Sequence, residues 1–480
     1  MHRRPNVLFL LTDDQRFDTI SGLGHPDIPT PNFDRLVGRG VAFDNAYIMG
    51  GSSGAVCMPS RAMIHTGRTL YHIDGVGQTI DPDHAMLGEH FARHGYDTFG
   101  TGKWHNGPET FARCFNAGAS VFFGGMSDHW NVPVCDFNPD GRYPEPRRTL
   151  VRYGPRLVQI DQRYERFATG THSTDLFVDD TRRWLASRDR DRPFFAYVSF
   201  MAPHDPREMP AEFLNRFDPH AVELPPIFMP EHPLDHGGLH GRDEQLAGFP
   251  RTEDDVRRHI AEYYAMITHL DARIGDLLDH LESSGQLDDT IVVLAGDNGL
   301  ACGQHGMMGK ECCYDHALHV PLLISGPGLP AGARRDNLCY LLDIFPTLCD
   351  LAGLDTPGTV EGRGPVPSTH GAGSSSRDEL LFAMTRNQRA IRDHRHKLIE
   401  TAHESTRVTQ LFDLLDDPRE MHDLADDSAH VETLTRLRRS LVTGWAALDD
   451  NREGQGGDFW RHFHDARDQH DAHVPFGVSQ

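Results

Sequence analysis

The sequence has no apolar run of about 18 residues, the length that a membrane-spanning helix needs. The apolar stretch near its start, residues 7–11, is too short for the core of a secretory signal and is followed by carboxylates. We interpret this stretch as a first core strand. The sequence therefore predicts no membrane span and a cytoplasmic location, unless an export signal precedes it.

Cysteine is also scarce, with eight in 480 residues. So few cysteines do not build a dense disulfide framework, and the adjacent Cys312 and Cys313 are poorly placed to bridge to each other. We expect most of the cysteines to be reduced thiols in the core. No Cys/His cluster has the spacing of zinc ligands.

Positive charge is in deficit as well, because 47 Lys and Arg face 70 Asp and Glu, which gives a net charge of -23. A chain this acidic is a poor non-specific binder of nucleic acid, so we expect no nucleic-acid partner. An anionic substrate would need a local basic pocket, to which some of the 31 histidines could contribute.

The length and the hydrophobic pattern, in contrast, are informative. A chain of 480 residues with 38% hydrophobic content suits one large core and a smaller appended domain. Over the first two thirds, short apolar runs alternate with segments of helical period, of which residues 256–281 are the clearest. This alternation predicts an α/β fold, with a large mixed, mostly parallel sheet sandwiched by helices. The predicted strands are residues 7–11, 96–101, 194–200, 290–295 and 320–324.

Two stretches lack regular periodicity. Residues 105–171 and 223–250 are rich in Gly, Pro and aromatic residues, and we expect long loops there that act as binding elements or lids. No internal repeat is visible.

Near residues 361–377 the composition changes to Gly, Ser and Pro, which indicates a linker. We therefore predict two domains, residues 1–375 and a smaller C-terminal α+β domain of residues 376–480. The last stretch, 451–480, is expected to be a loosely packed tail or a cover over a neighbouring subunit. The predicted elements of the smaller domain are strands at 380–384, 389–392, 397–400 and 410–414 and an amphipathic helix at 431–448.

The most informative motif is the segment C-M-P-S-R-A-M-I-H-T-G-R at residues 57–68. Pro59 suits a first helical turn, and the N–H groups around Ser60 and Arg61 would then face a bound oxyanion. Arg61 adds a planar, permanently charged fork. Read without its neighbours, Cys57 would be a small buried hydrophobic residue.

Two pairs of oxygen ligands follow predicted strands. Asp13 and Asp14 come after the first strand, and Asp297 and Asn298 come after the strand at 290–295. In open α/β sheets, ligands bind at this edge, and three carboxylates with one amide suit Ca²⁺ or Mg²⁺ better than zinc. Each pair taken alone is more often a helix cap than a metal ligand.

Basic residues follow other predicted strands in the same way. Lys103 and His105 come after the strand at 96–101, His204 comes after the strand at 194–200, and Lys310 follows the second ligand pair. Each alone could be a solvated surface group. Their shared position past strand ends favours one common site.

The order C-x-P-S-R-x-x-x-x-x-G at residues 57–67 resembles the signature of the type I sulfatases. In that family this cysteine is oxidised after translation to formylglycine by a maturation enzyme. One hydroxyl of the hydrated aldehyde attacks sulfur, and the other later expels sulfate. The resemblance extends over nearly the whole chain, including residues 29–36 and 411–420, and it implies the alkaline-phosphatase-like fold.

The resemblance also implies roles for individual residues. A calcium ion, with Mg²⁺ or Mn²⁺ as alternatives, would be bound by Asp13, Asp14, Asp297, Asn298 and the formylglycine made from Cys57. The catalytic residues would be Cys57, Arg61, Lys103, His105, His204 and Lys310. The two lysines would hold the sulfate, and His105 would take the proton of the formylglycine hydroxyl during sulfate release. His204 would either bind the sulfate or protonate the leaving oxygen.

The sequence departs from the family after Lys310. Residues 314–321 lack the acidic pair and the arginine that many relatives carry there, which predicts a weaker basic rim. Asp315 could be a partner for a lysine or a helix cap. We expect His129, Trp130 and His305 to contact the organic part of the substrate, because Trp offers a flat face to a ring.

The leading hypothesis is a calcium-dependent sulfuric ester hydrolase that acts on a sulfated carbohydrate. One alternative is a phosphonate monoester or phosphodiester hydrolase of the same superfamily. Another is a catalytically silent protein that binds an anion or a glycan and whose Cys57 is never converted. A homo-oligomer is compatible with each of these hypotheses.

Overall fold

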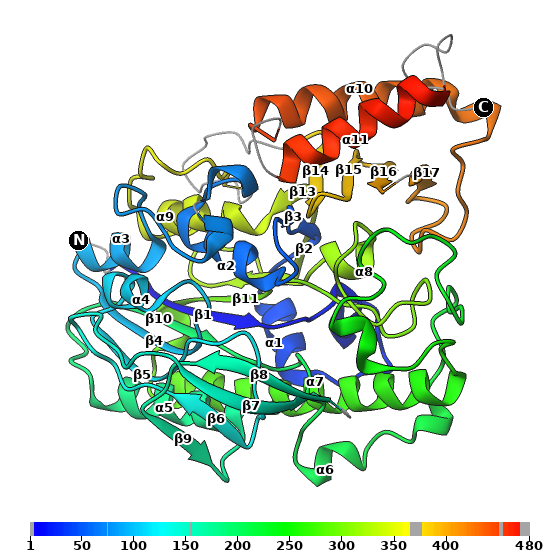
Figure 1. Cartoon of the computed structure of the whole chain (residues 1–480). Helices are drawn as coiled ribbons and strands as arrows, with labels where there is room; N and C mark the ends of the chain where they lie inside the picture. The colour runs from blue at the N-terminus through cyan, green and yellow to red at the C-terminus, as the bar shows by residue number, and fades with distance from the viewer. Residues whose placement is uncertain are drawn as a thin grey trace.

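The centre of the molecule is an eight-stranded sheet in the order β13-β2-β12-β11-β1-β10-β4-β5 (Figure 1). Strand β12 runs antiparallel to both of its neighbours, β11 and β2, whereas the other pairs in this sheet are parallel. The computed structural model describes residues 4–73, 75–153, 156–364, 377–404, 406–450 and 455–470. The strands of this sheet are β1 (Asn6–Thr12), β2 (Gly40–Tyr47), β4 (Asp97–Lys103), β5 (Ala117–Phe122), β10 (Phe194–Ser199), β11 (Thr290–Gly296), β12 (Leu322–Ser325) and β13 (Ala333–Tyr340).

The central strand β1 is buried on both faces, and successive side chains enter different cores. Val7, Phe9 and Leu11 belong to one hydrophobic cluster, whereas Leu8 and Leu10 belong to the other. This alternation follows from the two-residue period of a strand. Helices α2 (Cys57–Thr66), α3 (Leu87–Arg93) and α9 (Ile344–Ala352) pack in the first cluster, and α1 (Pro31–Arg39), α5 (Ser173–Ser187) and α7 (Glu253–Ser283) pack in the second.

A second sheet has the order β17-β16-β15-β14-β3. Its strand β3 comes from the N-terminal part of the chain, just before α2, and pairs in parallel with β14. This sheet therefore joins the C-terminal segment to the region that carries Cys57. Its elements and the helices near it are β3 (Gly50–Gly51), β14 (Leu380–Met384), β15 (Gln388–Arg392), β16 (His396–His403), β17 (Thr406–Asp413), α10 (Val431–Ala447) and α11 (Gln455–His470).

The strands and helices predicted around the core are confirmed, with ends that move by a few residues. The strand at 290–295 is β11, the helix at 256–281 is α7, and the strand predicted at 320–324 is the antiparallel β12. Three strands of the large sheet were not predicted, namely β2, β5 and β13. Their sequences mix small or polar residues with apolar ones.

The prediction of long loops at 105–171 was wrong in part. That stretch contains a short helix and several strands, which form two small antiparallel pairs and the edge strand β5. The remaining elements of the chain are α4 (Pro108–Cys114), β6 (Asn131–Val134), β7 (Arg147–Tyr153), β8 (Arg156–Gln162), β9 (Arg166–Thr169), α6 (Ala211–Leu214) and α8 (Asp315–Leu318).

The tail is also more ordered than expected. Residues 455–470 form α11, and Phe459, Trp460 and Phe463 on it are buried within the chain's own hydrophobic cluster. Part of the predicted tail is therefore core, because three aromatic residues at helical spacing bury one face. Most of the predicted linker at 361–377 lies outside the described residues.

Several side-chain classes are distinctive in their burial. All eight cysteines are free and buried, in agreement with the expected reduced thiols. The chain has only three lysines, Lys103, Lys310 and Lys397, and each is at most 2% exposed. Within the described part of the chain, no helix is long and apolar enough to cross a membrane.

Candidate active site

The site lies where four neighbouring strands of the large sheet end and α2 begins. The chain leaves β1 at Asp13, β4 at Lys103 and β11 at Asp297, and β10 is followed by the loop that carries His204. Because β1, β4, β10 and β11 are parallel, their carboxyl ends meet at one edge of the sheet. The structure brings these residues together as the sequence predicted.

Cys57 is the first residue of α2 and is 3% exposed. Its Sγ lies 3.4 Å from Lys103 Nζ and 3.4 Å from His105 Nδ1. Burial raises the pKa of the thiol, and the nearby lysine cations oppose that rise only in part. The encoded side chain is therefore a neutral thiol that faces a basic residue and a ring nitrogen.

One expectation about the start of α2 was wrong. The helix begins at Cys57, so the backbone N–H of Ser60 already donates to the carbonyl of Val56 at 3.3 Å. That N–H is therefore unavailable to an oxyanion. The Ser60 hydroxyl instead donates to the backbone carbonyl of Asp297 at 2.6 Å, which ties α2 to the end of β11.

Arg61 is fully buried and holds the two acidic segments together. Its Nε donates to Asp297 Oδ2 at 2.8 Å, and its Nη2 donates to Asp13 Oδ2 at 3.0 Å. Its Nη1 donates to the carbonyl of Lys103 at 2.9 Å and to the hydroxyl of Ser199. All three nitrogen atoms of the guanidinium thus donate to groups of the chain itself, so Arg61 holds the residues of the site in position.

The two site lysines are each paired with a carboxylate. Lys103 Nζ lies 2.5 Å from Asp13 Oδ2, and Lys310 Nζ lies 2.5 Å from Asp14 Oδ1. Burial opposes the charged form of both lysines, yet the carboxylates raise the pKa of each above its ordinary value. Both side chains therefore carry a positive charge inside the protein.

The acidic residues have oxygen atoms left over. Oδ1 of Asp13 and Oδ1 of Asn298 are buried and have no hydrogen-bond partner among the described residues. Ligand atoms of Asp13, Cys57 and Asp297 lie within 4.8 Å of one another, and so do those of Asp13, Asp14 and His204. Unsatisfied buried oxygens are costly, so this arrangement fits a bound cation.

The carboxyl groups of the two acidic residues that follow β1 behave differently. Burial and the neighbouring Asp297 carboxylate raise the pKa of Asp13 to about 7. Burial acts the same way on Asp14, but Lys310 outweighs it and lowers the pKa. A cation in the cluster would favour the ionised form of both.

Two histidines face the site. His204 Nε2 lies 3.6 Å from Asp14 Oδ2, and its Nδ1 is 2.8 Å from the backbone carbonyl of Asp205. Burial and nearby cations hold the pKa of His105 and His204 well below the ordinary value. Both imidazoles are therefore neutral at neutral pH and able to accept a proton.

Backbone strain marks the same positions. Asp14 has a φ of 62° and His105 has a φ of 67°, values that non-glycine residues rarely adopt. At the end of β4, the pairing with β5 shifts register between Thr101 and Gly102, just before Lys103. Such a bulge redirects the side chains that follow it.

The residues predicted to form a substrate wall are not gathered at the site. His129 is fully buried, with Nδ1 bonded to the Ser173 hydroxyl at 2.7 Å and Nε2 to the carbonyl of His204 at 3.2 Å. Trp130 packs edge-on against His172. His305 bonds the carbonyl of Glu420 at 3.0 Å and lies in a different cavity.

Asp315 does pair with a lysine, but not with one at this site. Its Oδ1 lies 2.6 Å from Lys397 Nζ, and it is the first residue of α8 without capping the helix through its side chain.

Sequence reasoning missed several residues that support the site. Asp205 accepts from Arg242 at 2.8 and 3.3 Å and lies beside His204. The Tyr263 hydroxyl donates to the carbonyl of Asp14 at 2.6 Å from α7. Asp205 directly follows His204 and could have been found from the sequence, whereas Arg242 and Tyr263 lie on distant segments without a local signal.

Comparisons with known proteins find similar sequences over most of the chain. Residues 5–354 match the family model described as Sulfatase, and residues 303–446 match the model described as N-sulphoglucosamine sulphohydrolase, C-terminal. An N-acetylglucosamine-6-O-sulfatase of Bacteroides thetaiotaomicron is 25% identical, with 94% of this chain and 88% of the relative covered.

Solved structures share the fold. A protein solved in complex with its substrate D-glucosamine-2-N,6-O-disulfate superimposes with a TM-score of 0.75 at 23% identity, covering 94% of this chain and 99% of its own. The phosphonate monoester hydrolase of Agrobacterium radiobacter gives a TM-score of 0.72 at 24% identity, over 93% of this chain and 96% of its own.

Proposed function

We propose that this chain, which belongs to the sulfatase family, hydrolyses the sulfate ester of a saccharide. Its nucleophile would be a formylglycine made from Cys57. The observation that carries the proposal is the position of Cys57 Sγ, which lies 3.4 Å from Lys103 Nζ beside the buried acidic residues. A sulfuric ester hydrolase needs a nucleophile at such a cationic centre.

A saccharide is the substrate class that the relatives support. One relative is named as an N-acetylglucosamine-6-O-sulfatase, and one structural neighbour was solved with a disulfated glucosamine.

Two groups that the family implies fit this site. The oxygens of Asp13, Asp14, Asp297 and Asn298 would hold Ca²⁺, with Mg²⁺ or Mn²⁺ as alternatives, and the ion would supply positive charge for a sulfate oxygen. Formylglycine, made from Cys57 by a maturation enzyme, would supply a hydroxyl nucleophile with a second hydroxyl for sulfate release.

The chain's own residues supply the remaining chemistry. Lys103 and Lys310 are charged, buried and on either side of the acidic residues, so they would bind sulfate oxygens and stabilise the growing negative charge. His105 Nδ1 faces position 57 and would take the proton from its hydroxyl. His204 Nδ1–H donates to the carbonyl of Asp205, so Nε2 is the free nitrogen and would have to gain a proton before it could pass one to the leaving oxygen.

Substitution of the nucleophile tests the proposal. We expect Cys57→Ala to abolish turnover of sulfate esters while thermal unfolding stays close to that of the wild type, because a small buried side chain is replaced by another. Cys302→Ala, which alters a buried cysteine in a hydrophobic cluster of the sheet, is the matched control and should keep its activity. Unfolding of the Cys57 variant would mean that Cys57 is chiefly structural.

Mass analysis of the peptide that contains Cys57 distinguishes an active enzyme from a catalytically inactive protein in which Cys57 is never converted. The tryptic peptide of residues 40–61 contains Cys57 and no internal Lys or Arg. After co-expression with a maturation enzyme, we expect this peptide to carry a carbonyl in place of the thiol. A fully unmodified thiol would favour a protein that only binds an anion or a glycan.

Matched esters separate the two reaction classes. Sulfate and phosphate esters are both tetrahedral anions, and the same lysines could hold either. We expect higher kcat/KM for a sulfate ester than for phosphate and phosphonate esters of the same alcohol. Preference for the phosphorus esters would assign the chain to the phosphonate monoester or phosphodiester hydrolases.

A further inference from the structure

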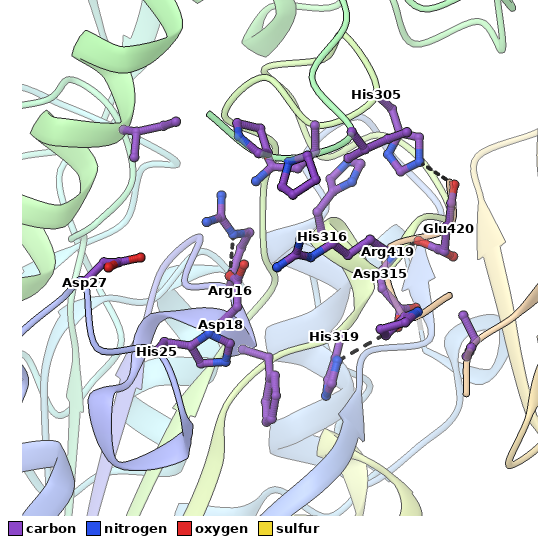
Figure 2. Close-up of a pocket in the computed structure, with 18 of the residues that line it drawn as sticks. Arg16, Asp18, His25, Asp27, His305, Asp315, His316, His319, Arg419 and Glu420 are labelled. Carbon is purple, nitrogen blue, oxygen red and sulfur yellow. Dashed lines mark hydrogen bonds and ion pairs between the residues drawn. The ribbon is translucent and has the colours of Figure 1, made fainter. Parts of the chain in front are cut away.

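A cavity of about 690 Å³ opens beside the C-terminal segment (Figure 2). Its walls come from the loop after β1, the loop at 223–227, α7, the segment 304–319 and the C-terminal residues 392–394 and 414–420. None of the residues of the candidate active site lines it. Its volume is within the range of small-molecule sites, which is about 300–1,000 Å³.

Arg16 provides a buried cation with unused bonding capacity in the wall. The residue is 4% exposed, and its Nε donates to Asp18 Oδ1 at 2.6 Å. Its Nη1 is buried and has no hydrogen-bond partner among the described residues. Because a buried N–H without a partner is costly, this guanidinium is suited to an acceptor from a ligand.

Arg419 provides a second guanidinium from the opposite side. It is exposed, lines the cavity, and makes no ion pair with any described residue. In Figure 2 its side chain extends into the cavity from the C-terminal segment. Two forks on facing walls can bind one oxyanion group, since guanidinium geometry matches carboxylate and sulfate.

Stacked rings line the floor between these cations. His319 lies between Phe17 and Tyr47, with ring centroids at 4.0 and 4.5 Å. His305 and His316 flank Tyr314 at 4.0 and 5.8 Å. Both faces of the His319 ring are covered in this stack, so a sugar can pack only against the outer sides of the stacked rings, while imidazole nitrogens can bond its hydroxyls.

The acidic groups in the cavity are mostly engaged already. Asp18 pairs with Arg16, whereas Asp315 and Glu420 both pair with Lys397, at 2.6 and 2.7 Å. Asp27 and Glu223 lie exposed at the rim, where they can accept from hydroxyls. Arg16 and Lys397 are therefore already paired with carboxylates, whereas the exposed Arg419 keeps a positive charge that no described carboxylate pairs with.

The wall is strained where its two halves meet. His305 has a φ of 53° and Glu420 has a φ of 57°, and the His305 ring bonds the Glu420 carbonyl. Asp14 and His105 are strained in the same way at the candidate active site. Rare backbone conformations of this kind persist at sites held in shape by their surroundings.

We propose that this cavity is a second binding site, separate from the candidate active site, for a sugar that carries a carboxylate or a sulfate. The oxyanion pairs with Arg419 and Arg16, the sugar ring packs against the aromatic residues of the cavity wall, and the hydroxyls bond the surrounding histidines. The cavity would therefore hold one unit of an anionic saccharide apart from the position where an ester is cut.

Calorimetric titration of the full-length Cys57→Ala protein tests this site without depending on ester hydrolysis. The probes are D-glucuronate, D-glucose 6-sulfate and neutral D-glucose. We expect an anionic sugar to bind more tightly than glucose, and Arg419→Ala to weaken it by about tenfold, the loss expected for one charge-assisted contact. Arg439→Ala, an exposed arginine on α10 outside the cavity, is the control and should change nothing.

The outcomes are distinct. Weakening of glucuronate alone would assign the cavity to uronic acids, weakening of glucose 6-sulfate alone would assign it to sulfated sugars, and either result supports the proposal. Equal binding of glucose and both anionic sugars, or unchanged affinity in Arg419→Ala, would overturn it. Because the readout is binding, failure here leaves the proposed ester hydrolysis untouched.

Discussion

At the scale of single residues, Arg61 is the side chain on which the site geometry depends most. It donates to carboxylates that follow two different strands and to the carbonyl of Lys103. A lysine would keep the charge but lose the fork, so it could not hold Asp13 and Asp297 together. We expect Arg61→Lys to lose most turnover and to unfold more easily by about 3–5 kcal/mol, the cost of breaking a buried pair.

Arg395→Lys is the matched control for Arg61→Lys. Arg395 also holds carboxylates, Asp413 and Asp416, but its side chain is 51% exposed. Water and salt screen exposed ion pairs, so this variant should be nearly neutral. Thermal unfolding, turnover and calcium binding are measured for both variants and compared. Normal calcium binding by a folded Arg61→Lys protein would show that the fork does not shape the acidic cluster.

Residues of the site were predictable from the sequence where they directly follow strands. Asp13, Lys103 and Asp297 were found because a strand end is visible in the sequence, and the fold then gathers such ends at one edge. Side chains whose partners lie far away in the chain gave no such signal. His129 was wrongly expected to contact substrate, because an aromatic-rich segment does not reveal that its ring is bonded to Ser173 and the His204 carbonyl.

At the scale of elements, the end of β4 determines where Lys103 points. Gly102 has a φ of 87°, and a Cβ there would collide with the carbonyl oxygen of Ser199 on β10. We expect Gly102→Ala to separate these strand ends, to lower turnover strongly and to destabilise the protein by more than the roughly 1–2 kcal/mol of the backbone conformation alone.

Gly95 offers a control with the same φ of 87°, but a Cβ at this position would have open space within 4 Å. Gly95→Ala should therefore cost only about 1–2 kcal/mol and leave turnover unchanged. Chemical denaturation and kinetic assays compare the two. Equal effects of both substitutions would contradict a special role for the close approach at Gly102.

The elements that the sequence did not reveal share a physical cause. Strands β5 and β13 form the edges of the large sheet and β2 lies next to β13, and in all three strands small or polar residues dilute the apolar pattern. The central strands were predictable because burial on both faces requires an unbroken apolar run. Helix α7 was predictable because its long apolar stripe must face the sheet.

At the scale of the whole molecule, a buried ionic cluster joins the two sheets. Lys397 on β16 pairs with Asp315 and with Glu420, and the Tyr47 hydroxyl at the end of β2 donates to Asp315 at 2.8 Å. Burial raises the pKa of Glu420 from 4.5 to about 7, and the Lys397 cation offsets this only in part.

This raised pKa predicts a pH dependence of stability. Between about pH 4.5 and about pH 7, the native state keeps a proton on Glu420 that the unfolded chain has released. The contribution of Glu420 to the free energy of unfolding therefore falls as the pH rises through this window. We expect Glu420→Gln to flatten the curve in denaturant titrations over the same range.

Glu432→Gln, at an exposed position on α10, should leave the pH dependence unchanged. A wild-type curve that rises from pH 4.5 to 7 specifically because of Glu420 would contradict the prediction, since it would mean that pairing with Lys397 outweighs burial.

The burial of all three lysines has a practical consequence for probing this protein in solution. Reagents that acylate amines will meet no lysine side chain on the native surface, so each modified lysine reports an opening event. The rate at which Lys397 is labelled would measure how often the two sheets separate. The rate at which Lys103 or Lys310 is labelled would measure how often the candidate active site opens. The three lysines thus report local opening of the native structure, and peptide mapping detects their modification without an added label.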